Sequence, residues 1–231
     1  MHIKGKVKSV KIFQYKAVKK NGKIKKEKID NSGSSVSVNN QFDFNKKGMV
    51  TEQRKYISDR FSKKFTYVYD DDLNILSKDY YDNSGNLLAE SKFENVHNSN
   101  GELIEEKEFM TGKNLDNNWT HKFFKNKNKV KKIDYSGEKS HEIREYFYDK
   151  NGNLIQENWN SPDGTIHMKT IMEYNDGNLK QTSILDSKDS LISNQYFEYL
   201  EFDHGNNWTK LLISENNKPE SIIEVEIEYY E

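Results

Sequence analysis

Residues 146–155 read YFYDKNGNLI, and this segment decides the fold that the sequence predicts. Two aromatic residues flank one position, Asp149 follows, and Asn151-Gly152 stands before a closing apolar pair. An Asn-Gly pair between alternating apolar runs is a strong hairpin signal, because both central residues of a type I′ turn need a positive φ. The segment therefore predicts a strand, a tight turn at residues 151–152 and a second strand.

Looser copies of this segment recur along most of the chain. The turns lie about 10 to 18 residues apart, as expected of strands connected by hairpins. No window shows a convincing 3.6-residue apolar period, and the best helix candidate, residues 52–64, barely lines one face. The predicted fold class is all-β: an antiparallel meander of repeated hairpins that forms a long twisted or curled sheet, as an open spiral or a partial barrel.

A longer repeat indicates the domain organisation. The tetrapeptide NNWT closes two blocks of the chain, and each block began with an aromatic-x-aromatic-Asp segment. Residues 65–125 and 146–213 are therefore interpreted as two copies of one several-stranded module that bury a shared face. We expect a single elongated β-repeat domain over residues 1–231, with basic N-terminal strands at 1–64 and an acidic strand at 220–231.

The two ends of the chain carry opposite charges. Residues 3–28 contain eleven lysines against one acid, Glu27, whereas every second residue of the segment 224–228 is a glutamate. Opposite charges directly across a ladder are favourable. Lys6 and Lys8 are therefore expected to face these glutamates if the first and last strands pair.

Composition excludes several classes of protein. Charged residues make up 32% of the chain and hydrophobic residues only 33%, which is typical of disorder, but an aromatic content of 13% favours β-structure with much exposed surface. The net charge of -1 gives no general electrostatic reason for binding nucleic acid or membranes. The lysines near the N-terminus alternate with apolar residues as on an exposed strand face, so we expect no nucleic-acid partner.

Cysteine usage and hydropathy bear on the compartment. The chain has 0 Cys, which excludes disulfides and thiolate metal sites. No apolar run approaches the roughly 18 residues of a membrane-spanning helix, so no transmembrane segment is expected. The N-terminus lacks a signal-peptide h-region, so the protein is expected in the cytoplasm, or in the envelope or periplasm if a leader was removed.

No motif for catalysis or metal binding stands out. Residues 70–74 begin like a calcium loop, but Ile75 stands where Gly is required and Tyr81 where a bidentate Glu belongs, so a solvated turn is the better interpretation. The six histidines show no close ligand spacing, and no nucleophile elbow or phosphate-binding glycine loop occurs. We expect no catalytic residue, no metal and no cofactor.

Large aromatic residues are the candidates for a binding surface. Tryptophan and tyrosine are enriched at the centres of interfaces. The alternative is that each tryptophan packs over the neighbouring strand of its own module. The candidate binding residues are Trp119, Trp159, Trp208, Tyr146 and Tyr148.

The repeated aromatic-x-Tyr-Asp-x-x-Gly-Asn-Leu pattern resembles the YD-repeat (RHS-like) proteins of bacteria. The residues that carry the resemblance are Tyr146, Tyr148, Asp149, Gly152, Asn153 and Leu154. The resemblance implies a long antiparallel sheet with a shell, scaffold or binding role. The chain is far too short for a complete shell, and it lacks the toxin and self-cleaving core of the large members.

These observations predict a non-enzymatic protein of bacterial origin that binds a protein partner, for instance an immunity or cell-envelope-associated factor. The partner would lie on an exposed face or edge of the sheet. The alternative is a carbohydrate-binding surface protein that uses tryptophan and tyrosine platforms. A third alternative is an enzyme whose site the sequence does not disclose, and the oligomeric state stays open.

Overall fold

The computed structural model describes residues 3–29, 39–57, 59–112, 117–136 and 138–231. Within these ranges the chain forms seventeen β-strands, and none of the described residues belongs to a helix that could cross a membrane. The strands are β1 (Val7–Lys20), β2 (Lys23–Lys28), β3 (Asn39–Phe44), β4 (Val50–Ile57), β5 (Arg60–Tyr69), β6 (Ile75–Tyr81), β7 (Leu87–His97), β8 (Leu103–Gly112), β9 (Asn117–Asn126), β10 (Lys129–Ser136), β11 (Lys139–Tyr148), β12 (Leu154–Asn160), β13 (Ile166–Asn175), β14 (Asn178–Asp186), β15 (Leu191–Phe202), β16 (Trp208–Glu215) and β17 (Lys218–Tyr229).

The all-β antiparallel meander is confirmed. Consecutive strands pair antiparallel through β3, β4, β5 and β6, and again from β8 to β15. The helix candidate at residues 52–64 is wrong, because residues 52–57 belong to β4 and residues 60–64 to β5, with Glu52 opposite Thr66 in the ladder. Residues 30–41 are small and polar, which predicts a loop or a weak edge strand, and most of them lie outside the described residues.

The turn that opened the sequence argument has a different conformation from the predicted one. Gly152 has a positive φ of 85°, but Asn151 does not, so the turn is not of type I′. Instead Asp149 begins a five-residue turn: its backbone N–H donates to Asn153 O at 2.9 Å, and its carboxylate accepts the backbone N–H groups of Asn151 and Asn153. The aspartate acts as an Asx cap, and one left-handed residue before the next strand completes the turn.

The same five-residue turn recurs seven more times among the described residues, with an Asp, Asn or Ser at its first position. In each turn the first residue's N–H donates to the fifth residue's carbonyl, and the fourth residue's N–H donates back to the first residue's carbonyl. Glycine usually takes the left-handed fourth position, but Leu73, Asp189 and Asn206 occupy it in three turns. The turns begin at Asn45, Asp70, Asp82, Asn98, Asp149, Ser161, Asp186 and Asp203.

Two compact units divide the chain: unit 1 comprises Met1–Glu90 and Phe197–Glu231, and unit 2 comprises Ser91–Tyr196. Both boundaries fall inside strands, β7 and β15, and inside the modules expected from the NNWT repeat. The single domain built from two such modules stays a prediction.

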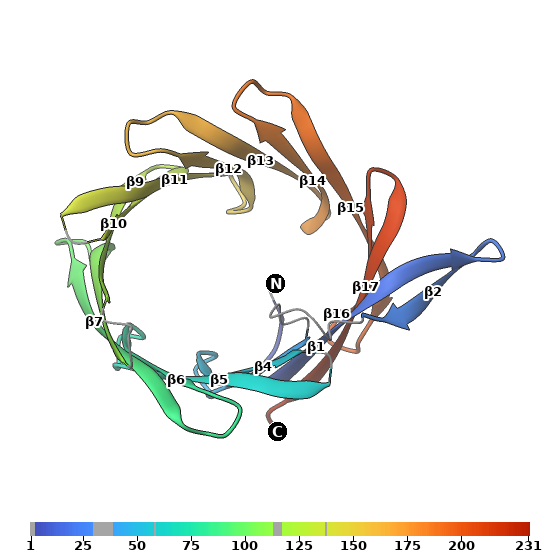
Figure 1. Cartoon of the computed structure of the whole chain (residues 1–231), viewed down its shortest axis with the longest axis horizontal. Helices are drawn as coiled ribbons and strands as arrows, with labels where there is room; N and C mark the ends of the chain where they lie inside the picture. Colours follow the sequence, from blue (N-terminus) through green and yellow to red (C-terminus); the bar gives the residue numbers. More distant parts are fainter. Residues whose placement is uncertain (1–2, 30–38, 58, 113–116, 137) are drawn as a thin grey trace. The chain divides into compact units, whose positions relative to one another are not determined.

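In unit 1 the long strand β1 pairs with other strands along both of its edges. It pairs with β17 along one edge from Val7 to Lys16, and its other edge pairs first with β3 and then with β2 (Figure 1). Val10, which is 1% exposed, packs with Val7 and Val225 in the core of this region. First-to-last strand pairing, the condition stated for the lysine–glutamate prediction, is therefore present.

The opposite charges at the two ends do meet across this ladder. Lys8 Nζ lies 2.6 Å from Glu228 Oε1, and Lys11 Nζ lies 3.7 Å from Glu226 Oε2. The hydrogen bond from Lys8 lowers the pKa of the Glu228 carboxyl. The predicted pairing is confirmed for Lys8, while the chain uses Lys11 rather than Lys6 for the second contact.

Replacing all three β17 glutamates with lysine is expected to destabilise unit 1. In the Glu224→Lys, Glu226→Lys, Glu228→Lys variant, lysines replace the glutamates that contact Lys8 and Lys11 of β1, Lys26 of β2 and Lys210 of β16. Its urea midpoint should therefore fall at low salt and recover in part at about 0.5 M salt, where screening is strong. The matching glutamine variant should lose much less. An unchanged midpoint for the lysine variant would contradict the importance of these pairs.

Candidate functional site

The candidate site is one face of the unit 2 sheet, named here the Trp159 face. Alternate residues of a strand share a face, and the printed register places these residues in three rows across the strands. The first row is Glu106, His121, Asp134 and Glu142; the second is Phe123, Lys132, Arg144, Trp159, Met168 and Asp186; the third is Lys125, Val130, Tyr146, Glu157, Thr170, Ile184 and Ser193.

The first row brings a histidine between carboxylates. His121 Nδ1 lies 2.5 Å from Asp134 Oδ1, and Lys132 Nζ lies 3.0 Å from the same oxygen. Burial alone would favour the protonated form of Asp134, but the hydrogen bonds from His121 and Lys132 outweigh it, so the pKa of this carboxyl is lowered. Asp134 therefore stays charged and orients the imidazole.

Glu106 lies directly opposite His121 on β8. Burial raises its pKa above the ordinary value of 4.5, although the nearby His121 and Lys132 act in the other direction. The charged form of Glu106 is thus disfavoured in the folded state. The first row therefore contains the Asp134 carboxyl, whose charged form is stabilised, and the Glu106 carboxyl, whose protonated form is favoured.

Glu106→Gln is expected to stabilise the protein at neutral pH. A carboxyl with a raised pKa in the folded state favours folding below its ordinary pKa, and this contribution is lost as the pH rises through the folded-state pKa. The urea midpoint of the variant should therefore exceed that of the wild type at pH 7 and match it near pH 4. The exposed Glu94→Gln serves as the control, and a lower midpoint for Glu106→Gln at pH 7 would contradict the expectation.

The second row centres on Arg144 and Trp159, which lie directly opposite each other on β11 and β12. The guanidinium carbon is 4.8 Å from the centre of the indole ring, within the range of a cation–π contact. Two carboxylates hold the guanidinium: Arg144 Nε donates to Glu142 at 2.5 Å and Nη1 donates to Glu157 at 2.7 Å. Trp159 remains 36% exposed, so a rigidly held Arg–Trp pair is open to solvent.

Four of the five residues expected to bind lie on this face: Trp159, Trp119, Tyr146 and Tyr148. Tyr146 is in the third row, opposite Glu157, and burial raises the pKa of its hydroxyl. Trp119 lies on the same face of β9, two residues before His121. Its ring makes an edge contact with the His141 ring, and the ring centres are 5.4 Å apart.

Tyr148 lies at the end of this face, two residues after Tyr146 on β11, whereas Trp208 does not belong to it. Tyr148 ends β11, and its backbone N–H donates to Asn128 O at 2.8 Å. Trp208 belongs to unit 1, where its ring contacts that of Tyr199 at 6.0 Å. Sequence reasoning also missed Arg144, Glu157 and His121, because only the register shows that they lie beside the aromatic residues.

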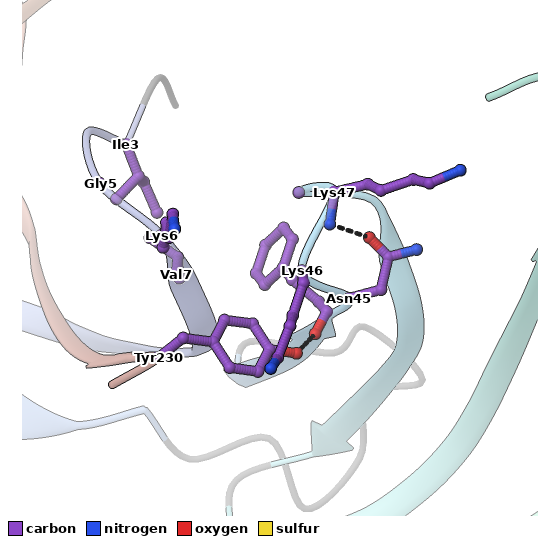
Figure 2. Close-up of a pocket in the computed structure, with 10 residues that line it drawn as sticks. Ile3, Gly5, Lys6, Val7, Asn45, Lys46, Lys47 and Tyr230 are labelled. Atoms are coloured by element: carbon purple, nitrogen blue, oxygen red, sulfur yellow. Dashed lines mark hydrogen bonds between the residues drawn. The ribbon is translucent and has the colours of Figure 1, made fainter. Parts of the chain in front are cut away.

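Unit 1 contains a hollow of about 330 Å³, which is separate from the Trp159 face (Figure 2). Tyr230 closes one side, since its backbone N–H donates to Lys6 O and its hydroxyl donates to Phe44 O. Figure 2 shows Lys46 bent toward the Tyr230 ring, 5.9 Å from its centre, while Lys47 extends away from it and lies 3.7 Å from Asp71. The lysines around the hollow therefore do not converge on one point.

The described residues include no group of three or more histidine, aspartate or glutamate side chains that could hold a metal ion. In the calcium-like segment, Asp70 accepts the backbone N–H of Asn74 at 2.8 Å and its side-chain amide at 2.9 Å. This carboxylate is occupied in the same turn motif as Asp149.

Comparisons with known proteins add little to the geometry. No family model and no curated protein matches the chain. Solved structures similar to it include a porin-like protein from Bacteroides uniformis, with 13% identity, a TM-score of 0.38 and coverage of 96% of each chain. Another is the Photorhabdus luminescens Tc holotoxin pore, with 14% identity and a TM-score of 0.28, covering 80% of this chain and 11% of that one.

At TM-scores below 0.5 neither similarity establishes a common fold. No family model supports the resemblance to YD-repeat proteins, which stays a prediction. What the chain itself defines is an all-β antiparallel protein with a charged and aromatic sheet face.

Proposed function

We propose that this protein is a non-enzymatic binding protein of bacterial origin that holds a protein partner on the Trp159 face. An immunity or cell-envelope-associated factor would be a protein of this kind. The proposal includes the finer expectation for the fold, a YD-repeat-like sheet that curls as an open spiral or a partial barrel.

The observation that carries the proposal is the Arg144–Trp159 pair. Tryptophan, tyrosine and arginine are the residue types that dominate binding energy at protein interfaces. Here they lie in neighbouring rows of one face, with Tyr146 beside Glu157 and Glu157 bound to Arg144. Two carboxylates already order the guanidinium, so a partner would lose little side-chain entropy on binding.

Carbohydrate binding has less support from this geometry. A sugar stacks on a bare aromatic face, whereas Arg144 lies over the Trp159 ring, and the ring of His167 contacts it at 6.0 Å. Catalysis also has less support. His121 and Lys132 both contact the Asp134 carboxylate, and the first row has no hydroxyl or thiol nucleophile.

The test is quantitative affinity capture from cells of the source organism, followed by direct binding to the partner that is captured. Trp159→Ala combined with Tyr146→Ala should weaken that binding at least thirtyfold, the effect of removing a hot spot worth about 2 kcal/mol. The matched control is Phe124→Ala, because Phe124 is an aromatic residue in unit 2 that is 53% exposed and points to the opposite face.

Equal binding by the double variant and the wild type would contradict the proposed surface. A glycan array provides the second measurement. Hits that disappear in the double variant would replace the protein partner with a carbohydrate.

A further inference from the structure

The chain contains three Asn-Gly pairs, and the structure places them in two kinds of turn. Asn21-Gly22 forms the two-residue turn between β1 and β2, at the tip of a hairpin that projects past the neighbouring strands of unit 1 (Figure 1). Asn100-Gly101 and Asn151-Gly152 take the third and fourth positions of five-residue turns. The residues of all three pairs are exposed, so the pairs differ in their hydrogen bonds rather than in their access to water.

An Asn-Gly pair carries its own nucleophile and electrophile. The glycine nitrogen, once it has lost its proton, attacks the Cγ carbon of the asparagine side chain. A C–N bond forms, the bond from Cγ to the side-chain nitrogen breaks, and that nitrogen takes up a proton and leaves as ammonia. Water then opens the five-membered succinimide at either carbonyl carbon, which yields aspartate or isoaspartate. Water is the co-reactant, and the sequence of steps involves no oxidation.

Two of the pairs are held out of this reaction by their turns. Gly152 N–H donates to Asp149 O at 3.1 Å, and Asn151 N–H donates to the Asp149 carboxylate at 2.8 Å. Asn100-Gly101 makes the equivalent bonds to Asn98, at 2.9 Å from the asparagine and 3.0 Å from the glycine. The glycine nitrogen approaches Cγ only if the peptide between the two residues rotates, and this rotation breaks both bonds.

The turn at Asn21-Gly22 lacks these restraints. Gly22 N–H donates to no other backbone group of the residues that the structure describes. Rotation of this peptide disturbs only the last pair of the ladder, Lys20 opposite Lys23, where like charges are unfavourable. The open end of a ladder also unpairs at low cost compared with its interior. The Gly22 nitrogen is therefore the most available of the three nucleophiles.

The charge around this turn favours the same step. The attacking nitrogen is negative after it loses its proton, and Lys20 and Lys23 flank it on both sides. Glu27 forms an ion pair with Lys20, whereas Lys23 forms none with another described residue. The carboxylate of the product would stand between two lysines that face each other across the turn, so it relieves their repulsion.

We propose that Asn21 is a modification site that deamidates spontaneously in the folded protein, while the five-residue turns protect Asn100 and Asn151. The reaction lowers the positive charge of the lysine-rich segment 16–28 by one, and its isoaspartate product inserts a methylene into the backbone of a two-residue turn. Asn21 lies in unit 1 and shares no contact with the Trp159 face. The proposal goes beyond the function proposed above and can fail without it.

The experiment incubates the full chain at mildly alkaline pH and follows each Asn-Gly pair by peptide mapping with mass spectrometry. Asn21 should react at least tenfold faster than Asn100 or Asn151. A tenfold ratio corresponds to about 1.4 kcal/mol, which the loss of two ordinary hydrogen bonds supplies. The same incubation in concentrated urea is the control, because there the turns are absent and the three pairs should react at similar rates.

Asp149→Ala tests the protecting bonds themselves. Without the carboxylate that binds its N–H, Asn151 should react several-fold faster, whereas the rate at Asn21 should stay the same. Lys23→Gln should slow Asn21 and leave Asn151 unchanged, and circular dichroism checks the fold of both variants.

Equal rates at the three pairs in the folded chain would overturn the proposal. It would also be overturned if folding slowed Asn21 as much as Asn151, relative to urea. An unchanged rate at Asn151 in the Asp149→Ala variant would count against it as well, because the turn's hydrogen bonds would then not be what separates the pairs.

Discussion

Asn207→Ala is expected to lower the free energy of unfolding by about 3 kcal/mol, among the largest effects of any single polar substitution in unit 1. Asn207 is 5% exposed and ties the N-terminal segment to the turn before β16. Its Oδ1 accepts the backbone N–H of Lys4 at 2.7 Å, and its Nδ2 donates to Lys4 O at 3.1 Å and to the Tyr229 hydroxyl at 2.7 Å. Alanine would leave these partners without their bonds in a site with little access to water.

Urea denaturation at pH 7 measures this loss, and the equivalent residue of another turn supplies the control. Asn153 also ends a five-residue turn, but its side-chain amide donates only to Asp149, at 2.9 Å. Asn153→Ala should therefore cost about 1 kcal/mol or less. If the two variants lose equal stability, Asn207 is a turn residue like the others, and the contacts with Lys4 and Tyr229 do not hold the N-terminus.

The local pattern predicted the hairpins correctly but not their turn type. Asn151-Gly152 has the composition of a type I′ turn, while Asp149, two positions earlier, is of a residue type that forms Asx turns, so the sequence supports both interpretations. In the structure the Asp149 carboxylate binds two backbone N–H groups, which stabilises a longer turn with only Gly152 left-handed. At Asn21-Gly22 a two-residue turn connects β1 and β2, and both of its residues have a positive φ, as expected of type I′.

Alternation along one strand also predicted the contact between the chain ends, because charge pairing needs only the period of two. Predicting the candidate site from the sequence needs more information than this period. Arg144 and Trp159 are fifteen residues apart, and nothing in their own strands shows that they lie opposite each other. The bulge beside Tyr148 lies on β12, where Ile155 is the extra residue, so Tyr148 keeps its alternation with Tyr146 but lies opposite Leu154. Register depends on turn length and bulges, so a pattern within one strand predicts which residues share a face but not which residues meet across it.

Val10→Ala is expected to destabilise unit 1 by about 2–3 kcal/mol, from lost burial and the cavity that remains. Val10 is the most deeply buried apolar residue of the described core, at 1% exposure. It lies on β1 opposite Ile227 of β17 on one side and Phe42 of β3 on the other, so three strands lose contacts at once. The urea midpoint, with the slope unchanged, measures the effect.

Val68→Ala is the matched control, because it makes the same substitution in another strand of unit 1. Val68 is 53% exposed, so its replacement loses the same intrinsic β-preference but little burial, and should cost about 0.5 kcal/mol. The difference between the two variants then isolates packing from strand propensity. Few side chains among the described residues are fully buried. Equal losses would therefore mean that the hydrogen-bonded ladders and their charge pairs, rather than an apolar core, hold the first and last strands together.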